Sequence, residues 1–291
     1  MNTPHRPAPL TLASPPDSVD SDMAPLLSEP FAGLWAQDEA AARPQEALRG
    51  RLVARLAASR AEEAVMFTVR RRRLPAQSLG TGVLAQTLYL AQSSGHLRPG
   101  EPWRARLMTL APGARLTPDQ LGDAGELEAR HREWLLVSGQ ADADGQPMGE
   151  RDYRVTPAGF ESPSWFSTSG ALLFLRESDQ PCLPGDSPTT VFDAEAGWPD
   201  YAPGVRRRVL WQCEGQAALL YCAQPGAEVP RHRHGHDEEC LMVQGELYLD
   251  DLLLQPGDYQ LAPAGSGHRI TATDTGVVIY AHGDLDLDFV G

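Results

Sequence analysis

A tandem repeat in the amino-acid sequence limits what this chain can fold into more than any other feature. Three motifs recur at one constant offset of 106 residues. The first is EWLLVSG at 133, which recurs as ECLMVQG at 239. The second is DY followed by PAG, which begins at 152 and again at 258. The third is GALLF at 170, which recurs as GVVIY at 276. Agreement of three motifs in one register is improbable by chance, so the sequence predicts two copies of one structural unit. A fourth motif, PGA, recurs at 112 and 225, and one seven-residue insertion in the first copy accounts for its offset of 113.

Both copies consist of short apolar runs separated by Gly, Pro and Asp. From Phe67 onward these breaks come about every 8 to 12 residues, a spacing typical of short strands joined by turns. Runs such as ARLMTLAPG, EWLLVSG, ALLFLRE and VVIYAHG have the composition of strands. Helical patterns of comparable strength do not follow residue 64. The expected fold class is therefore all-β, with one jelly-roll barrel for each copy.

The N-terminal part of the chain differs from the rest. Residues 1–43 carry seven prolines and little apolar periodicity, which predicts a mostly disordered tail. In residues 44–65, Leu48, Leu52 and Leu56 recur at helical spacing, which predicts one amphipathic helix. The expected parts are the tail at 1–43, the helix at 44–65, a first barrel at 66–180 and a second barrel at 181–291.

Charge and composition exclude several classes of partner. A formal net charge of −14 argues against binding to nucleic acid or to an anionic membrane surface. The chain has no apolar run of about 18 residues that could span a membrane, and its N-terminus lacks the apolar core of a secretory signal. Four cysteines are scattered without a C-x-x-C pair, at Cys182, Cys213, Cys222 and Cys240. We therefore expect a cytoplasmic protein without disulfide bonds.

Four potential metal ligands lie close together in the second copy. His232 and His234 are two residues apart, so both side chains point to the same face of an extended strand. After a short turn a returning strand brings Glu238 beside them, and a Pro-x-Gly turn at 263–265 re-aims a later segment so that His268 completes the set. Three imidazoles and one carboxylate suit a borderline divalent cation. We expect one divalent transition metal ion (Zn, Fe, Mn or Ni) per chain.

Neighbouring residues offer alternatives to this set. His236 is two residues after His234 and would point to the same face of a strand, but it lies at the turn. Glu239 points away from Glu238 if the segment is a strand. Cys240 shares the face of Glu238, where it is either a small buried hydrophobic residue or a thiol that responds to the metal.

At the equivalent positions, 106 residues earlier, the first copy has no such set of metal ligands. Glu238 maps to Arg132 and His268 maps to Ser162, while His131 is adjacent but stands alone. An arginine without imidazoles around it holds a cation poorly. We therefore expect a metal-free first barrel that serves packing, partner binding or small-molecule binding.

The segments PGAEVPRHRHGHDEECLMVQG and PGDYQLAPAGSGH resemble the two conserved motifs of the cupin superfamily. The second motif usually ends in Asn, where this chain has Ala272. The resemblance implies two cupin barrels, the first of them degenerate. It also implies that the metal ligands are His232, His234, Glu238 and His268.

Within the cupins, residues 200–285 look most like the cupin domain of ChrR-type anti-sigma factors, with a degenerate copy at about 100–176. In that family the cupin senses a signal while an N-terminal zinc-binding helical domain holds a sigma factor. Here the first cysteine is Cys182, and His5 is the one histidine in the first 90 residues, so the ligands for that zinc are absent. We therefore do not expect a sigma factor as partner.

Two functions are compatible with these features. The first is a metal-binding sensor or regulator without catalytic activity. The second is a mononuclear metal-dependent dioxygenase that acts on a small dicarbonyl or aromatic substrate. An enzyme needs an open ligand position that faces a pocket with polar orienting groups, whereas a sensor tolerates a closed site. We also expect self-association into a homo-oligomer, because barrel edges need covering, and a small-molecule ligand in a barrel is an open possibility.

Overall fold

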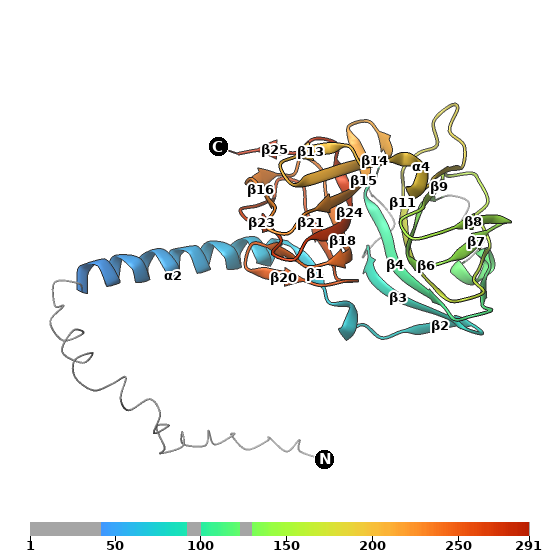
Figure 1. The fold of residues 1–291 in the computed structure, drawn as a ribbon, viewed down its shortest axis with the longest axis horizontal. Coiled ribbons are helices and arrows are strands. Elements are labelled where there is room, and N and C mark those ends of the chain that lie inside the picture. Colours follow the sequence, from blue (N-terminus) through green and yellow to red (C-terminus); the bar gives the residue numbers. More distant parts are fainter. Residues whose placement is uncertain (1–41, 92–99, 123–129, 291) are drawn as a thin grey trace, which may run out of the picture. The chain divides into compact units, whose positions relative to one another are not determined.

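The computed structural model of the protein describes residues 42–91, 100–122 and 130–290 (Figure 1). The tail expected at 1–43 lies almost wholly outside these residues. The chain divides into two compact units, Met1–Ala58 and Ser59–Gly291, and both barrels belong to the second unit.

Helix α2 spans Ala42–Val65 and covers the range expected for the helix. Its Ala, Leu, Arg and Glu content gives it a high intrinsic helix propensity. The side chains of Leu48, Leu52 and Leu56 are all exposed to solvent. Among the described residues, no helix combines the length and the apolar character needed to cross a membrane.

The first barrel contains two antiparallel sheets. The larger has seven strands in the spatial order β12 (Thr189–Val191), β9 (Tyr153–Thr156), β6 (His131–Gly139), β11 (Ala171–Ser178), β4 (Pro102–Leu110), β3 (Val83–Leu90) and β2 (Gln77–Gly80). The smaller has four strands in the order β5 (Arg115–Leu116), β10 (Trp165–Phe166), β7 (Ala141–Ala143) and β8 (Gln146–Met148).

The second barrel has the same two sheets and a third, shorter one. Its seven-stranded sheet has the order β1 (Phe67–Val69), β21 (Tyr259–Ala262), β18 (Glu238–Gly245), β24 (Val277–Asp284), β15 (Gln216–Ala223), β14 (Val205–Cys213) and β13 (Asp200–Ala202). Its four-stranded sheet has the order β16 (Glu228–Val229), β23 (Thr271–Ala272), β19 (Leu247–Leu249) and β20 (Leu252–Leu254). The third sheet has the order β22 (Gly267–His268), β17 (His232–Arg233) and β25 (Asp288–Phe289).

The strand boundaries reproduce the sequence repeat. Strands β21 and β24 begin and end 106 residues after β9 and β11, and β16 begins 113 residues after β5. The expected all-β fold with two barrels in tandem is therefore confirmed. A single turn of 3-10 helix at Arg71–Arg73, another at Pro118–Leu121 and the short helix α4 at Asp193–Ala196 are the remaining helical segments of the described chain.

Each barrel receives one edge strand from outside its own repeat. Strand β1 lies before the first barrel in sequence but pairs with β21 of the second, and Arg70 next to it forms an ion pair of 2.7 Å with Asp258. Strand β12 follows the first repeat and pairs with β9 of the first barrel. The ranges 66–180 and 181–291 therefore each include one strand that joins the sheet of the other barrel.

The two barrels share a core between their seven-stranded sheets. One apolar cluster combines Leu107 and Phe174 of the first barrel with Leu241 and Tyr280 of the second. The rings of Phe174 and Tyr280 lie 5.2 Å apart. Burial of this shared apolar surface stabilises the packing of one barrel against the other.

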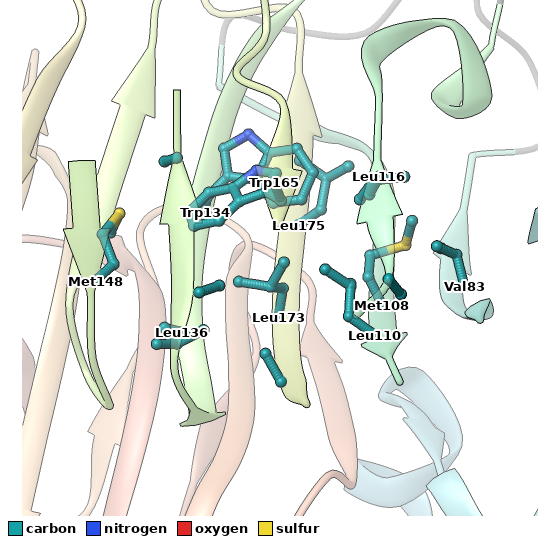
Figure 2. Close-up of a cluster of buried hydrophobic side chains, with 14 of the residues drawn as sticks. Val83, Met108, Leu110, Leu116, Trp134, Leu136, Met148, Trp165, Leu173 and Leu175 are labelled. Carbon is teal, nitrogen blue, oxygen red and sulfur yellow. The ribbon is translucent and has the colours of Figure 1, made fainter. Parts of the chain in front are cut away.

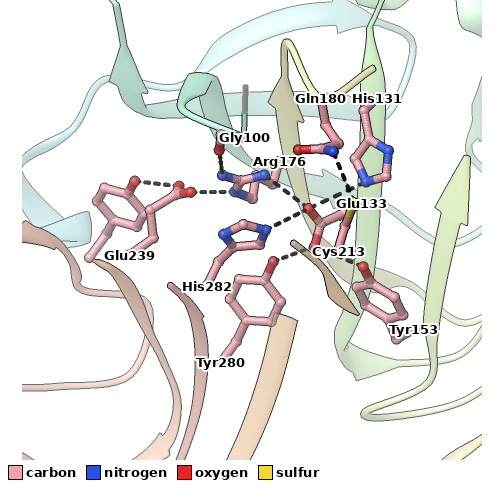
Figure 3. A network of polar contacts seen from close by, with 11 residues as sticks. Gly100, His131, Glu133, Tyr153, Arg176, Gln180, Cys213, Glu239, Tyr280 and His282 are labelled. Atoms are coloured by element: carbon pink, nitrogen blue, oxygen red, sulfur yellow. Dashed lines mark hydrogen bonds and ion pairs between the residues drawn. The ribbon is translucent and has the colours of Figure 1, made fainter. Parts of the chain in front are cut away.

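A buried ion network lies within this junction (Figure 3). The guanidinium of Arg176 donates to the carboxylates of both Glu133 and Glu239, and all three side chains are about 1% exposed. Glu133 also accepts hydrogen bonds of 2.7 Å from Tyr153 and Tyr280. The register relates Glu133 to Glu239, so the network joins equivalent positions of the two repeats.

Acid is expected to destabilise the fold through this network. Burial alone would raise the pKa of Glu133, but the charges of His282 and Arg176 lower it well below its usual range. Burial lowers the pKa of His282, whose Nε2 lies 3.3 Å from Glu133. Both folded-state pKa values lie below the unfolded ones, so the unfolded chain binds more protons as pH falls. The free energy of unfolding should therefore decline from about pH 6.5 downward.

Thermal unfolding of chelator-treated protein between pH 7.5 and 4.5 measures this effect. His282→Gln, which cannot be protonated, should flatten the upper part of the decline. A wild-type protein equally stable at pH 7.5 and pH 5 would contradict the assignment.

Candidate metal centre

The short sheet found in the second barrel alone, among the described residues, positions two of the predicted ligands. In the pairing of β17 with β22, His232 lies directly opposite His268. Gly267 permits this close approach, because a Cβ atom there would lie 2.3 Å from the carbonyl oxygen of His232. Both histidine side chains are buried.

The other two predicted ligands lie at the adjacent turn. His234 follows β17, and its amide donates to the carbonyl of Ser266 at 3.0 Å. Glu238 is the first residue of β18, with a carboxylate oxygen 3.4 Å from Nδ1 of His234. One ligand atom from each of His232, His234 and Glu238 falls within 4.8 Å of the others.

The ring of His268 packs against both of the other rings, although no atom of His268 belongs to that tighter group of three. Its centroid is 5.6 Å from that of His232 and 5.1 Å from that of His234. The structure thus groups the ligand atoms of His232, His234 and Glu238, and it places the ring of His268 against the two other rings.

The hydrogen bonds of the rings leave nitrogen lone pairs for a cation. Nδ1 of His232 lies 3.0 Å from the carbonyl of Pro230, and Nδ1 of His268 lies 3.5 Å from a carboxylate oxygen of Asp250. A ring that donates from Nδ1 carries its lone pair on Nε2. Neither ring nitrogen of buried His234 has a hydrogen-bond partner among the described residues. Unpaired buried nitrogens next to a carboxylate fit a bound divalent cation.

The local electrostatics favour a neutral ring for His234 and an ionised carboxylate for Asp250. Burial lowers the pKa of His234, which keeps its ring neutral at pH 7. Burial alone would raise the pKa of Asp250, but hydrogen bonds from His268 and the amide of Arg269 lower it. An ionised carboxylate behind a histidine fixes the tautomer and strengthens the ring as a ligand.

The two alternative ligands are engaged elsewhere. Nδ1 of His236 lies 2.6 Å from a carboxylate oxygen of Asp284, and its side chain is 44% exposed. Glu239 points into the junction between the barrels, where it accepts from Arg176 and, at 2.6 Å, from the hydroxyl of Tyr259. Both residues are therefore separate from the cluster around His234.

A cavity of about 60 Å³ opens beside the cluster. His232, Glu238 and His268 form part of its wall, together with Tyr221 and Cys240. Burial and the charge of Glu238 raise the pKa of the Cys240 thiol well above its usual range. The side chain is also buried in an apolar cluster with Met242 and Leu247, which favours the interpretation of Cys240 as a small buried residue.

Tyr221 supplies a polar group to this cavity. Its hydroxyl is buried, and the side chain of Arg207 acts on it through both its charge and a hydrogen bond. Burial and the charge of Glu238 raise its pKa, so the hydroxyl keeps its proton.

The first barrel is filled where the second is hollow. Under the 106-residue offset, Trp134 and Trp165 are equivalent to Cys240 and Thr271 of the second barrel. Both tryptophans are fully buried, and their ring centroids lie 5.2 Å apart (Figure 2). Arg132, the counterpart of Glu238, is buried and donates to the carbonyl of Phe160 at 2.6 Å. The described part of the first barrel contains no metal-ligand group of the kind seen in the second.

Sequence reasoning missed Asp250, Tyr221 and the role of the two tryptophans. Asp250 lies in a turn between the two motifs, outside both of them, and carries no local signal of its partner. The tryptophans could have been found by carrying the 106-residue register through every position of the second barrel.

Comparison with known protein families gives a match for the second repeat. Residues 186–286 match the family model described as the ChrR Cupin-like domain, which is roughly a third of the chain. Among proteins of curated function, none matches this sequence.

Solved structures extend the likeness to both repeats. A putative dioxygenase from Nostoc punctiforme is 12% identical, with a TM-score of 0.58 over 78% of this chain and 85% of that one. Protein Ylba from E. coli is 16% identical, with a TM-score of 0.57 over 75% of this chain and 90% of that one. The oxalate decarboxylase of Lactobacillus farciminis is 14% identical, with a TM-score of 0.52 over 77% and 87%. At these identities the likeness concerns the fold alone. The chain is thus an all-β protein of two barrels in tandem, and residues 186–286 of the second barrel match the ChrR Cupin-like domain.

Proposed function

We propose that the second barrel binds one divalent transition metal ion through His232, His234, Glu238 and His268. Four observations support this ligand set: the grouping of the ligand atoms, the free lone pairs of the rings, the unpaired nitrogens of His234, and the carboxylate behind His268. The ion would act as a Lewis acid and as a template for substrate and dioxygen.

We further propose that the protein is a metal-dependent dioxygenase that acts on a small dicarbonyl or aromatic molecule. The cavity carries this proposal, because a closed site would need no space beside its ligands. Tyr221 lines the cavity, and its hydroxyl can donate a hydrogen bond to a carbonyl oxygen of the substrate. In a dioxygenase both oxygen atoms enter the product, so the reaction requires no external reductant. The limited volume favours a small dicarbonyl over an aromatic substrate.

An oxygen-uptake screen tests the proposal. Protein loaded anaerobically with Fe(II) should consume oxygen with at least one small dicarbonyl, in a ratio of one O₂ per substrate. Glu238→Ala should abolish the uptake, because the site then loses the carboxylate that partly neutralises the cation. Glu228→Ala removes an exposed carboxylate of β16 and should leave the uptake unchanged. Equal uptake by the two variants would contradict the role of Glu238.

A sensor or regulator is the second candidate, favoured by the ChrR-like match of residues 186–286. It uses the same ligands, but its output is a change in assembly or partner binding instead of turnover. Metal-loaded protein that consumes no oxygen across the screen, yet changes its sedimentation on metal removal, would favour this candidate over the enzyme.

A further inference from the structure

Two residues that line the space beside the proposed metal are smaller than their counterparts in the first repeat. Thr271 lines the cavity where the first barrel has Trp165, and Ala281 lines it where the first barrel has Leu175. Both large counterparts are fully buried in a closely packed core (Figure 2). The same barrel architecture therefore accepts either a filled or a hollow interior at these two positions.

The wall of the cavity away from the histidines is apolar. Aliphatic side chains from five different strands and the C-terminal segment supply most of it, among them Val205, Val229, Leu247, Ile279 and Leu287. A cavity of about 60 Å³ has room for roughly four water-sized groups. The part of a ligand that does not reach the metal must therefore be short and apolar.

The charges limit the ligand further. Glu238 is the one formally charged side chain among the described lining residues, and none of these residues is a lysine or an arginine. Arg207 acts on Tyr221 but lies outside the lining and donates to the carbonyl of Leu285 and the carboxylate of Asp286. A divalent cation with Glu238 leaves one net positive charge. A second negative charge on the ligand would be buried without a partner, which is strongly unfavourable.

We infer that the cavity binds a small molecule with an apolar body and at most one negative charge, and that Thr271 and Ala281 set its size. This inference rests on the proposed function, because it takes the metal as one wall of the site. Small dicarboxylates with two charges are then poor ligands, although their two oxygens chelate metal ions well in water.

Two probes of similar size test the charge limit on full-length protein loaded with Co(II). Butanoate has one carboxylate and a propyl tail, and malonate has two carboxylates. The visible absorption of the bound cobalt reports entry of either probe into its coordination shell. We expect butanoate to change the spectrum at a concentration at least ten-fold lower than malonate. Because malonate is the stronger ligand for cobalt in water, the opposite order at the site would overturn the charge limit.

Two filling variants test the size limit with residues that the first repeat already contains. Thr271→Trp and Ala281→Leu should each bind one cobalt per chain but weaken the response to butanoate at least ten-fold. Thr189→Trp makes the same exchange on the exposed edge strand β12 and should respond as the wild type does. Ala281→Leu adds a short aliphatic chain, so it remains informative if Thr271→Trp fails to fold.

The outcomes separate this inference from the proposed function. Undiminished butanoate binding by a folded, cobalt-loaded filling variant would overturn the inference and leave the metal site standing. A wild-type chain that binds no cobalt would overturn the proposed function, and the inference with it.

Discussion

His232→Ala and His268→Ala should each lower the affinity for the metal by more than about 100-fold, because loss of a direct ligand costs more than loss of its supporting hydrogen bond. Wild-type protein should hold about one metal ion per chain by elemental analysis after equilibrium dialysis. His236→Ala is the matched control: its ring pairs with Asp284 and is half exposed, so its removal should leave the metal content near one.

Two results would contradict this prediction in different ways. Two tightly bound ions per chain would show that the first barrel is not free of ligands. Full metal retention by both histidine variants would exclude the proposed site itself.

Arg176→Met should destabilise the protein by about 3–5 kcal/mol, the usual cost of removing one partner from a buried ion pair. The substitution removes the guanidinium that pairs with the carboxylates of both Glu133 and Glu239 in the buried junction, and Glu133 keeps imidazoles such as that of His282 beside it. Arg154→Met, on strand β9, removes an arginine that donates to Gln146 and Thr190, and it should cost about 1 kcal/mol or less. Urea unfolding followed by tryptophan fluorescence measures both variants.

The informative quantity is the difference in the free energy of unfolding between the Arg176→Met and Arg154→Met variants. If the free energies of unfolding of the two variants agree within about 1 kcal/mol, the ion network contributes little to joining the barrels. A broadened or two-step transition for Arg176→Met would instead indicate that the barrels unfold separately once the junction is broken, in support of its role.

The sequence predicted the barrels well because the pattern of each strand occurs twice, once in each repeat. EWLLVSG and ECLMVQG both place an apolar strand in the same register, and β6 and β18 contain them. The exchange of β1 and β12 was not predictable in this way. Each has three residues, too few for a periodic pattern, and each pairs with a strand more than 30 residues away in sequence.

Four of the site's residues carry a spacing signal and the others do not. His232, His234 and Glu238 lie on or next to two successive strands joined by a short turn, so local geometry brings them together, and His268 ends the second motif. The cavity depends instead on how large each inward residue is across the whole barrel. That property appears when Thr271 is compared with Trp165 and is invisible in either segment alone.

Self-association stays a prediction. The swapped strands β1 and β12 each form one edge of a seven-stranded sheet, and β13 and β2 form the opposite edges. The exposed leucines of α2 are a second apolar surface, and light scattering at micromolar concentration measures the oligomeric state directly.

The location of the metal tests the account most directly. Anomalous diffraction from a crystal of metal-loaded protein, collected at the absorption edge of the bound element, should give one strong peak per chain. The peak should lie within coordination distance of His232, His234, Glu238 and His268. A peak bound instead by His236 or Glu239, or a second peak in the first barrel, would contradict the account.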